Sequence, residues 1–184
     1  VYSFSSYNLK EYHLNNPENL LQLQLSAVPA YCKTQDYREP KTAELLKDTI
    51  APDWNLTTLD SKNISLSDYK GHLVLIDFFY KDCPPCRKAI PVLQSFYQKY
   101  ENKGLRIIGI DPIDEKDSVV KHFISKVGIP YQVLLDKKEV NKDYHVSGYP
   151  TLYLIDKKGN VIFSNVGFDE SLEGKLEELV KSNL

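Results

Sequence analysis

The chain has 184 residues, of which 42% are hydrophobic and 26% are charged, and its formal net charge is −2. These values are typical of a globular protein with room for one substantial core, and the lack of a strongly basic block excludes nucleic acid as an expected partner. The chain contains no run of 18 apolar residues, so no membrane span is predicted. Because the chain begins at Val1 and contains no methionine, we expect that a leader, a lipid-anchored segment or a preceding domain has been removed.

Two regions of different composition follow each other along the chain. Residues 1–47 contain no glycine and are expected to form a partly helical N-terminal extension of unknown function. Asn16 is a suitable N-cap for one helix, and the pattern over residues 41–48 predicts another. Cys32, also in this extension, is interpreted as an inert thiol. The sharper patterns of residues 48–184 predict the main domain, on which the extension is expected to pack.

Strands and helices alternate in residues 48–184. Two short strand patterns around a polar turn at residues 60–63 predict a hairpin. The next segment, residues 72–80, is an almost continuous apolar run interrupted by Asp77, which predicts a central strand covered on both faces. An amphipathic helix follows and ends before Gly104.

The remaining elements complete the order of an α/β domain. Strand, helix, strand, short helix, two strands and a last helix are predicted at residues 105–111, 115–128, 131–136, 137–146, 149–156, 160–167 and 169–184. This order predicts a mostly parallel sheet covered by helices and finished by an antiparallel pair.

Cys83 and Cys86 are spaced as C-x-x-C where the central strand gives way to a helix. A structural zinc site needs four ligands, and no second cysteine pair or suitably spaced histidines are present. A purely structural disulfide would close a very small loop and stabilise little. A reactive dithiol fits better, because the free N–H groups and dipole of a helix N-terminus stabilise a thiolate at Cys83. Pro84 and Pro85 need no N–H donor there and stiffen the loop.

Residues 74–91, "VLIDFFYKDCPPCRKAIP", resemble the active-site segment of the thioredoxin fold. Pro91 matches the proline that kinks the active-site helix of that family. The segment "SGYPT" resembles the family's second active-site loop, which implies that the bond between Tyr149 and Pro150 is cis and lies beside the cysteines. The family binds an extended substrate segment along that loop, so these two residues are expected to contact substrate together with Pro84 and Pro85.

Further segments narrow the resemblance to one branch of the family. Residues 51–79 resemble the opening of redoxin domains, and residues 111–136 resemble the extra strand–helix element of TlpA- and ResA-like thiol-disulfide oxidoreductases. The segment "TLYLIDKKGNVIF" resembles their closing hairpin. The resemblance implies a thioredoxin-like α/β fold, with a central mixed β-sheet flanked by helices and preceded by the N-terminal extension.

The chain departs from its relatives around the dithiol. Many ResA-like proteins have a glutamate at the position of Ala89 and an asparagine at the position of Asp77, whereas thioredoxins have an aspartate at the latter. Asp77 is therefore the candidate proton acceptor for Cys86, with a pKa raised by desolvation. Ile107 occupies the position at which thioredoxins have a lysine. Because that cation is missing here, the expected pKa of Asp77 is higher still. The alternative is that Asp77 points to a polar edge and has no role.

The turn before Cys83 also differs. Asp82 replaces the usual tryptophan, and its charge opposes a thiolate at Cys83. Lys81 and Arg87 are available to offset that charge, although the simpler interpretation is that both are solvated.

Aromatic residues also gather near the dithiol in the sequence. Tyr80, Tyr149 and Trp54 are candidates for an apolar lip that binds client chains, with ordinary core positions as the alternative.

The sequence thus predicts a thiol-disulfide oxidoreductase that exchanges disulfides with protein substrates, as a reductant, with no cofactor and no metal. Cys83 attacks the substrate and Cys86 resolves the mixed disulfide. The family implies an extracytoplasmic, periplasmic location, with membrane anchoring through a missing segment as one option, and an upstream thiol electron donor, for which a membrane protein is one option.

Two other functions stay open. A thiol peroxidase of the redoxin type would have threonine at position 80 and proline at position 77, where this chain has Tyr80 and Asp77. The other alternative is a non-enzymatic interaction module in which the dithiol is vestigial.

Overall fold

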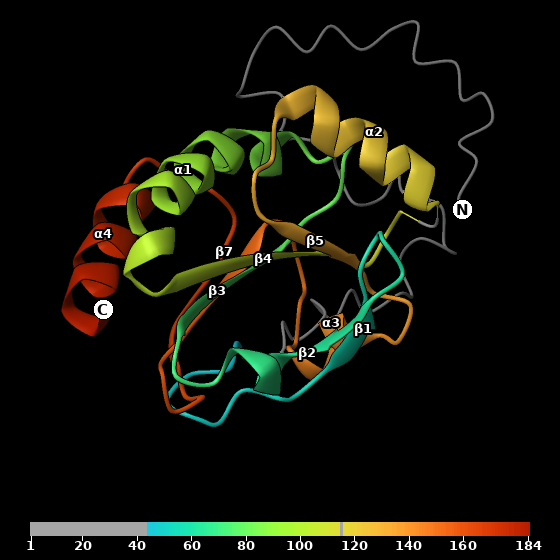
Figure 1. Ribbon diagram of the computed structural model, residues 1–184. Helices are drawn as coiled ribbons and strands as arrows, with labels where there is room; N and C mark the ends of the chain where they lie inside the picture. Colours follow the sequence, from blue (N-terminus) through green and yellow to red (C-terminus); the bar gives the residue numbers. More distant parts are fainter. Residues whose placement is uncertain (1–43, 115) are drawn as a thin grey trace, which may run out of the picture. The chain divides into compact units, whose positions relative to one another are not determined.

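The computed structural model describes residues 44–114 and 116–184, and a five-stranded sheet lies at the centre of this part (Figure 1). The strand order is β5–β4–β3–β6–β7, with bounds Gln132–Leu135, Leu105–Asp111, Leu73–Phe78, Thr151–Ile155 and Val161–Val166. β3 runs parallel to β4 and antiparallel to β6, while β4–β5 is parallel and β6–β7 antiparallel. The predicted α/β fold with a central mixed sheet is therefore confirmed.

The two faces of the sheet are covered by different elements (Figure 1). One, here called the helix face, packs against α1 (Pro84–Tyr100), α2 (Asp117–Val127) and α4 (Leu172–Asn183). The other, here called the hairpin face, packs against the antiparallel hairpin of β1 (Asn55–Thr57) and β2 (Asn63–Ser65), the 3-10 helix η4 (Leu66–Tyr69) and the short helix α3 (Val140–Asp143). A second 3-10 turn, η5 (Glu101–Lys103), follows α1. Each face buries its own hydrophobic cluster.

β3 is buried along its whole length because it is the middle strand of the sheet. Its side chains alternate between the faces, since successive residues of a strand point to opposite sides. Leu73 and Leu75 belong to the helix-face cluster, whereas Val74, Ile76 and Phe78 belong to the hairpin-face cluster. By the same alternation, the side chain of Asp77 belongs to the helix face.

Helix α1 begins and ends as its sequence predicts. Cys83 is its N-cap, and prolines occupy the first two helical positions, where no intrahelical N–H bond is lost. Pro91 lies inside the helix. The chain leaves the following η5 turn at Gly104, whose φ of 107° lies in the left-handed region that glycine adopts without strain.

The helix predicted over residues 41–48 is wrong for the part that the structure describes. Residues 44–47 have no helical structure. Instead, Leu45 and Leu46 pack against the hairpin-face cluster. The N–H of Asp48 donates to the carbonyl of Val161 at 2.9 Å, and the N–H of Val161 donates to the carbonyl of Thr49 at 2.8 Å. Tertiary packing and pairing with the start of β7 therefore override the local helical pattern.

Predictions for residues 1–43, including the helix at Asn16 and the inert thiol of Cys32, lie outside the described residues. The domain boundary after residue 47 likewise stays a prediction. Within residues 44–114 and 116–184, no helix is long and apolar enough to cross a membrane.

Candidate active site

Cys83 and Cys86 are joined by a disulfide in the first turn of α1, with their Cα atoms 5.2 Å apart. The Sγ of Cys83 accepts a hydrogen bond from the backbone N–H of Cys86 at 3.1 Å. A sulfur in this position takes the place of a capping oxygen, so its thiolate form would receive the same donor and the positive end of the helix dipole. The arrangement suits a nucleophilic thiolate at Cys83.

The disulfide lies directly beneath the surface. The exposed fraction is 2% for Cys83 and 1% for Cys86, although Asp82 and Pro84 on either side of Cys83 are exposed. This burial differs from the open nucleophile that an attack on substrate requires. Both sulfurs belong to the helix-face cluster, against which Tyr80 packs. In the disulfide form, both cysteines are therefore almost completely buried.

Asp77 is a fully enclosed carboxyl group on the helix face, 1% exposed, and its Oδ1 has no hydrogen-bond partner among the described residues. Burial raises its pKa from 3.8 to about 7. The facing residue on β4 is Gly109, and Ile107 pairs with Leu75, so no cation stands where thioredoxins place a lysine. The interpretation of Asp77 as a polar edge residue is wrong, because β3 is the central strand.

The turn before Cys83 is fastened by charged groups. Lys81 forms an ion pair with Asp82, and the Nη2 of Arg87 lies 3.8 Å from the Oδ1 of Asp82. The Nε of Arg87 also donates to the carbonyl of Lys81 at 3.0 Å. Both side chains thus pair with Asp82 while they stay in contact with solvent, with exposed fractions of 28% for Lys81 and 57% for Arg87. Exposed pairs of this kind stabilise little, but here they offset the charge of Asp82 beside the sulfur.

Sequence reasoning missed two carboxyl groups near this turn, Asp111 and Asp114. The Oδ2 of Asp114 accepts the backbone N–H of Lys81 at 3.1 Å. The segment "DPID", residues 111–114, carried a signal for their position. It begins at the end of β4, the parallel neighbour of β3, and the ends of parallel strands meet at one edge of the sheet.

Aromatic residues line part of the same end of the sheet. The rings of Tyr80 and Tyr149 meet edge to face, with centroids 5.4 Å apart. The Tyr149–Pro150 bond is cis, as the resemblance implies. Trp54, the third candidate for an apolar lip, is instead buried in the hairpin-face cluster with 5% exposure. The lip, as far as the structure brings it together, is therefore the Tyr80–Tyr149 pair.

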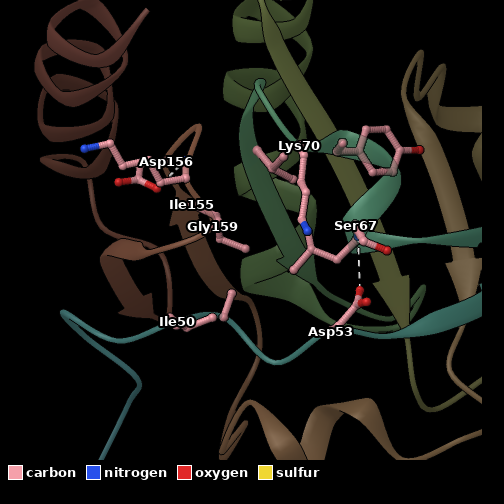
Figure 2. Close-up of a pocket in the computed structure, with 12 residues that line it drawn as sticks. Ile50, Asp53, Ser67, Lys70, Ile155, Asp156 and Gly159 are labelled. Carbon is pink, nitrogen blue, oxygen red and sulfur yellow. Dashed lines mark hydrogen bonds between the residues drawn. The ribbon is translucent and has the colours of Figure 1, made fainter.

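A cavity of about 340 Å³ opens elsewhere, on the hairpin face (Figure 2). At its edge, the Oδ1 of Asp53 accepts the N–H of Ser67 at 3.1 Å. Val74, near the start of β3, lines this cavity, whereas the dithiol follows the far end of that strand. The cavity and the dithiol therefore lie at opposite ends of β3.

This fold, with a vicinal cysteine pair at the start of its first long helix, defines a thioredoxin-like thiol-disulfide oxidoreductase. The model of the AhpC/TSA family matches residues 48–164, and the chain belongs to that family.

Known relatives agree with this class. A protein named thiol-disulfide oxidoreductase ResA from Bacillus thuringiensis (strain Al Hakam) is 39% identical over 132 residues, covering 70% of this chain and 76% of the relative. A protein of the same name from Bacillus cereus is 37% identical over 164 residues, covering 88% and 92%. Among solved structures, a putative thiol:disulfide interchange protein DsbE from Chlorobium tepidum superposes with a TM-score of 0.71 at 31% identity, covering 76% of this chain and 99% of its own.

Proposed function

We propose that the protein reduces disulfides in protein substrates through Cys83 and Cys86. The observation that carries this proposal is the position of the Cys83 sulfur, which caps α1 and accepts the N–H of Cys86 at 3.1 Å. A thiolate is the attacking form in disulfide exchange, and this position supplies more of it at neutral pH.

Exchange proceeds in two displacements. The Cys83 thiolate attacks one sulfur of the substrate disulfide, forms a mixed disulfide and expels the other substrate sulfur as a thiolate, which takes up a proton. The Cys86 thiolate then attacks the Cys83 sulfur and expels the remaining substrate thiolate. Two electrons have passed to the substrate, and the protein ends in the disulfide form that the structure shows.

Asp77 is assigned as the proton acceptor for Cys86. It lies on the helix face of the sheet with both cysteines, and a pKa of about 7 leaves it able to take up and release a proton near neutral pH. No lysine competes for its charge at the Ile107 position.

Four residues around the sulfurs are assigned to substrate binding: Tyr149, Pro150, Pro84 and Pro85. Tyr149 is half-buried and pairs with Tyr80, so it offers an apolar surface beside the dithiol. The ring of Pro84, which directly follows Cys83, is exposed and adds to this apolar surface.

The electron donor and the location of the protein are part of the same proposal. After each turnover the pair is oxidised, so we infer an upstream thiol electron donor, with a membrane protein as one option. An extracytoplasmic location, periplasmic in a cell with two membranes, is part of the proposal and draws support from the likeness to proteins named ResA and DsbE.

The roles of the two cysteines are tested by trapping. Cys86→Ser should accumulate mixed disulfides with a disulfide-bonded client such as insulin, whereas Cys83→Ser should not, because only the first cysteine attacks the client. The wild-type chain should accelerate insulin reduction by dithiothreitol. Equal trapping by the two variants would contradict the roles, and no acceleration with both cysteines intact would favour the non-enzymatic alternative.

The direction of electron flow is tested by equilibrating the dithiol with glutathione. A reductant should give a potential near that of thioredoxin, about −270 mV, whereas a value near about −120 mV would make the protein an oxidant. Quantifying the oxidised fraction by mass spectrometry after thiol alkylation measures this directly.

A further inference from the structure

The cavity on the hairpin face has the size of a small-molecule site (Figure 2). Its volume of about 340 Å³ lies at the lower end of the range of about 300–1,000 Å³ that is usual for ligand pockets. The space therefore suits a small ligand better than a large cofactor.

Buried aliphatic side chains form part of the cavity lining: Ala51, Leu66, Val74 and Ile155. They come from the segment before β1, from η4, from β3 and from β6, so the sheet and the elements packed on it hold the lining in place. Apolar surface is covered favourably by another apolar group, because both leave water. The lining therefore favours a ligand with an aliphatic body.

Ile50 extends the apolar lining to the surface of the protein. Its side chain lines the cavity and is 76% exposed, the largest exposed fraction of any large hydrophobic residue in the described part of the chain. An isolated bridge to Asn160, next to the start of β7, fixes the backbone of Ile50. A ligand in the cavity that also covers Ile50 would remove this apolar surface from water.

The two carboxyl groups of the lining already accept hydrogen bonds from the chain itself. The Oδ1 of Asp53 accepts the N–H groups of Trp54 at 2.9 Å and Ser67 at 3.1 Å. For Asp156, the backbone N–H of Asn160 donates to Oδ1 at 2.8 Å, and the side-chain amide of Asn160 donates to Oδ2 at 3.0 Å. These donors offset the negative charge that the two carboxylates bring to the cavity.

The two lysines of the lining, Lys70 and Lys158, are not neutralised in this way. Neither ammonium group forms an ion pair within residues 44–114 and 116–184. Lys70 directly follows η4, which supplies Leu66 to the lining, and Figure 2 shows its side chain among the lining residues. The charge that is left for a ligand is therefore positive, and an anionic group complements it.

We propose that this cavity binds a small aliphatic carboxylate, whose hydrocarbon body lies on the buried aliphatic lining and against Ile50 and whose carboxylate is bound by Lys70. One carboxylate matches the charge of one ammonium group. The cavity and the dithiol lie at opposite ends of β3, so this binding function is separate from disulfide exchange.

The direct test is a titration of the oxidised full chain with octanoate near pH 8, where the carboxyl group is ionised, followed by NMR of the methyl groups. The methyl signals of Ile50, Leu66, Val74 and Ile155 should shift together and saturate, with a dissociation constant of about 0.1–1 mM for so small a ligand. Shifts that stay linear with concentration, or that arise only elsewhere in the protein, would overturn the proposal.

The charge of Lys70 is tested by comparing octanoate with the uncharged octanol. Lys70→Ala should weaken octanoate binding about tenfold, at the low end for a hydrogen bond to a charged group, and should leave octanol binding unchanged. Lys126→Ala is the matched control, because Lys126 is an exposed lysine near the end of α2, on the helix face. Equal octanoate affinities in the Lys70 and Lys126 variants would overturn the proposal.

The contact with Ile50 is tested with the same two ligands. Ile50→Ser should weaken octanoate and octanol alike, by about threefold, because the aliphatic body is common to both. Loss of neither ligand would contradict the proposed orientation of the hydrocarbon body. The titrations need no redox activity, so octanoate binding without client reduction would contradict the proposed function alone, and client reduction without octanoate binding would contradict this proposal alone.

Discussion

Asp77 combines a stability cost with a chemical use. Its carboxyl group is buried, and burial raises its pKa to about 7, so it stays neutral up to about that pH. The same environment would let it accept a proton from Cys86 near neutral pH. The sequence was sufficient to single out this residue, because one acid interrupts an otherwise apolar run. Its complete burial depends on β3 being the middle strand, which the apolar run predicts and the sheet order confirms.

Asp77→Asn should stabilise the fold at high pH. The unfolded carboxyl ionises near 3.8 and the folded one near 7, so the unfolded state releases its proton first and the wild type loses stability between these values. Converted to energy, this difference amounts to as much as about 4 kcal/mol. Urea unfolding should show equal stabilities at pH 4 after correction for other groups, and a more stable variant at pH 8.

Asp60→Asn is a suitable control, because the side chain of Asp60 is 84% exposed and its removal should leave the pH dependence unchanged. A variant at position 77 that tracks the wild type at every pH would show that the folded pKa is not raised. If Asp77 is also the proton acceptor, the same variant should resolve mixed disulfides about 10²-fold more slowly, at the low end of general base effects.

At the scale of elements, the close contact between β4 and the segment after β3 depends on Gly109, which has no side chain. A Cβ on Gly109 would lie 2.8 Å from the Cε1 of Phe79 and 3.1 Å from the Cγ2 of Val133. Phe79 is 1% exposed and leads directly into the Cys83 turn, so it has little space to move. The sequence shows a glycine in a strand but not which ring requires it.

Gly109→Ala should therefore lower the free energy of unfolding by about 1–3 kcal/mol through overpacking. Gly174→Ala is the matched control, since Gly174 lies within α4 and a Cβ added there would meet no heavy atom of a neighbouring element within 4 Å. That change should stabilise the protein by roughly 0.5–1 kcal/mol, because alanine favours the helix. Chemical denaturation of both variants measures the difference, and equal effects would contradict the close contact.

At the scale of the molecule, the two faces of the sheet differ, because only one of them carries the dithiol. The helix face holds the two cysteines and Asp77, whereas the hairpin face holds Trp54 and a buried tyrosine, Tyr144. The hydroxyl of Tyr144, which follows α3, donates to the carbonyl of Pro52 at 2.7 Å and so joins the chain before β1 to the end of α3. Changes on the hairpin face should thus alter stability without altering the dithiol.

Tyr144→Phe tests this separation. Loss of the hydrogen bond should destabilise the fold by about 1–2 kcal/mol, while the reduction potential against glutathione stays at the wild-type value. Asp77→Asn serves as the contrast, because it should change both quantities. A shift in potential with Tyr144→Phe would show that the two faces are coupled.

The sequence by itself determined the order of elements, the start of α1 at the cysteine pair and the central position of β3. These follow from local signals: prolines at a helix start, apolar runs and glycine after a helix. The tertiary structure alone decided that residues 44–47 are not helical, that Trp54 lies on the face away from the sulfurs and that Asp114 reaches the Lys81 turn. Such contacts join residues far apart in the chain, and their energies depend on burial and distance, which no local pattern encodes.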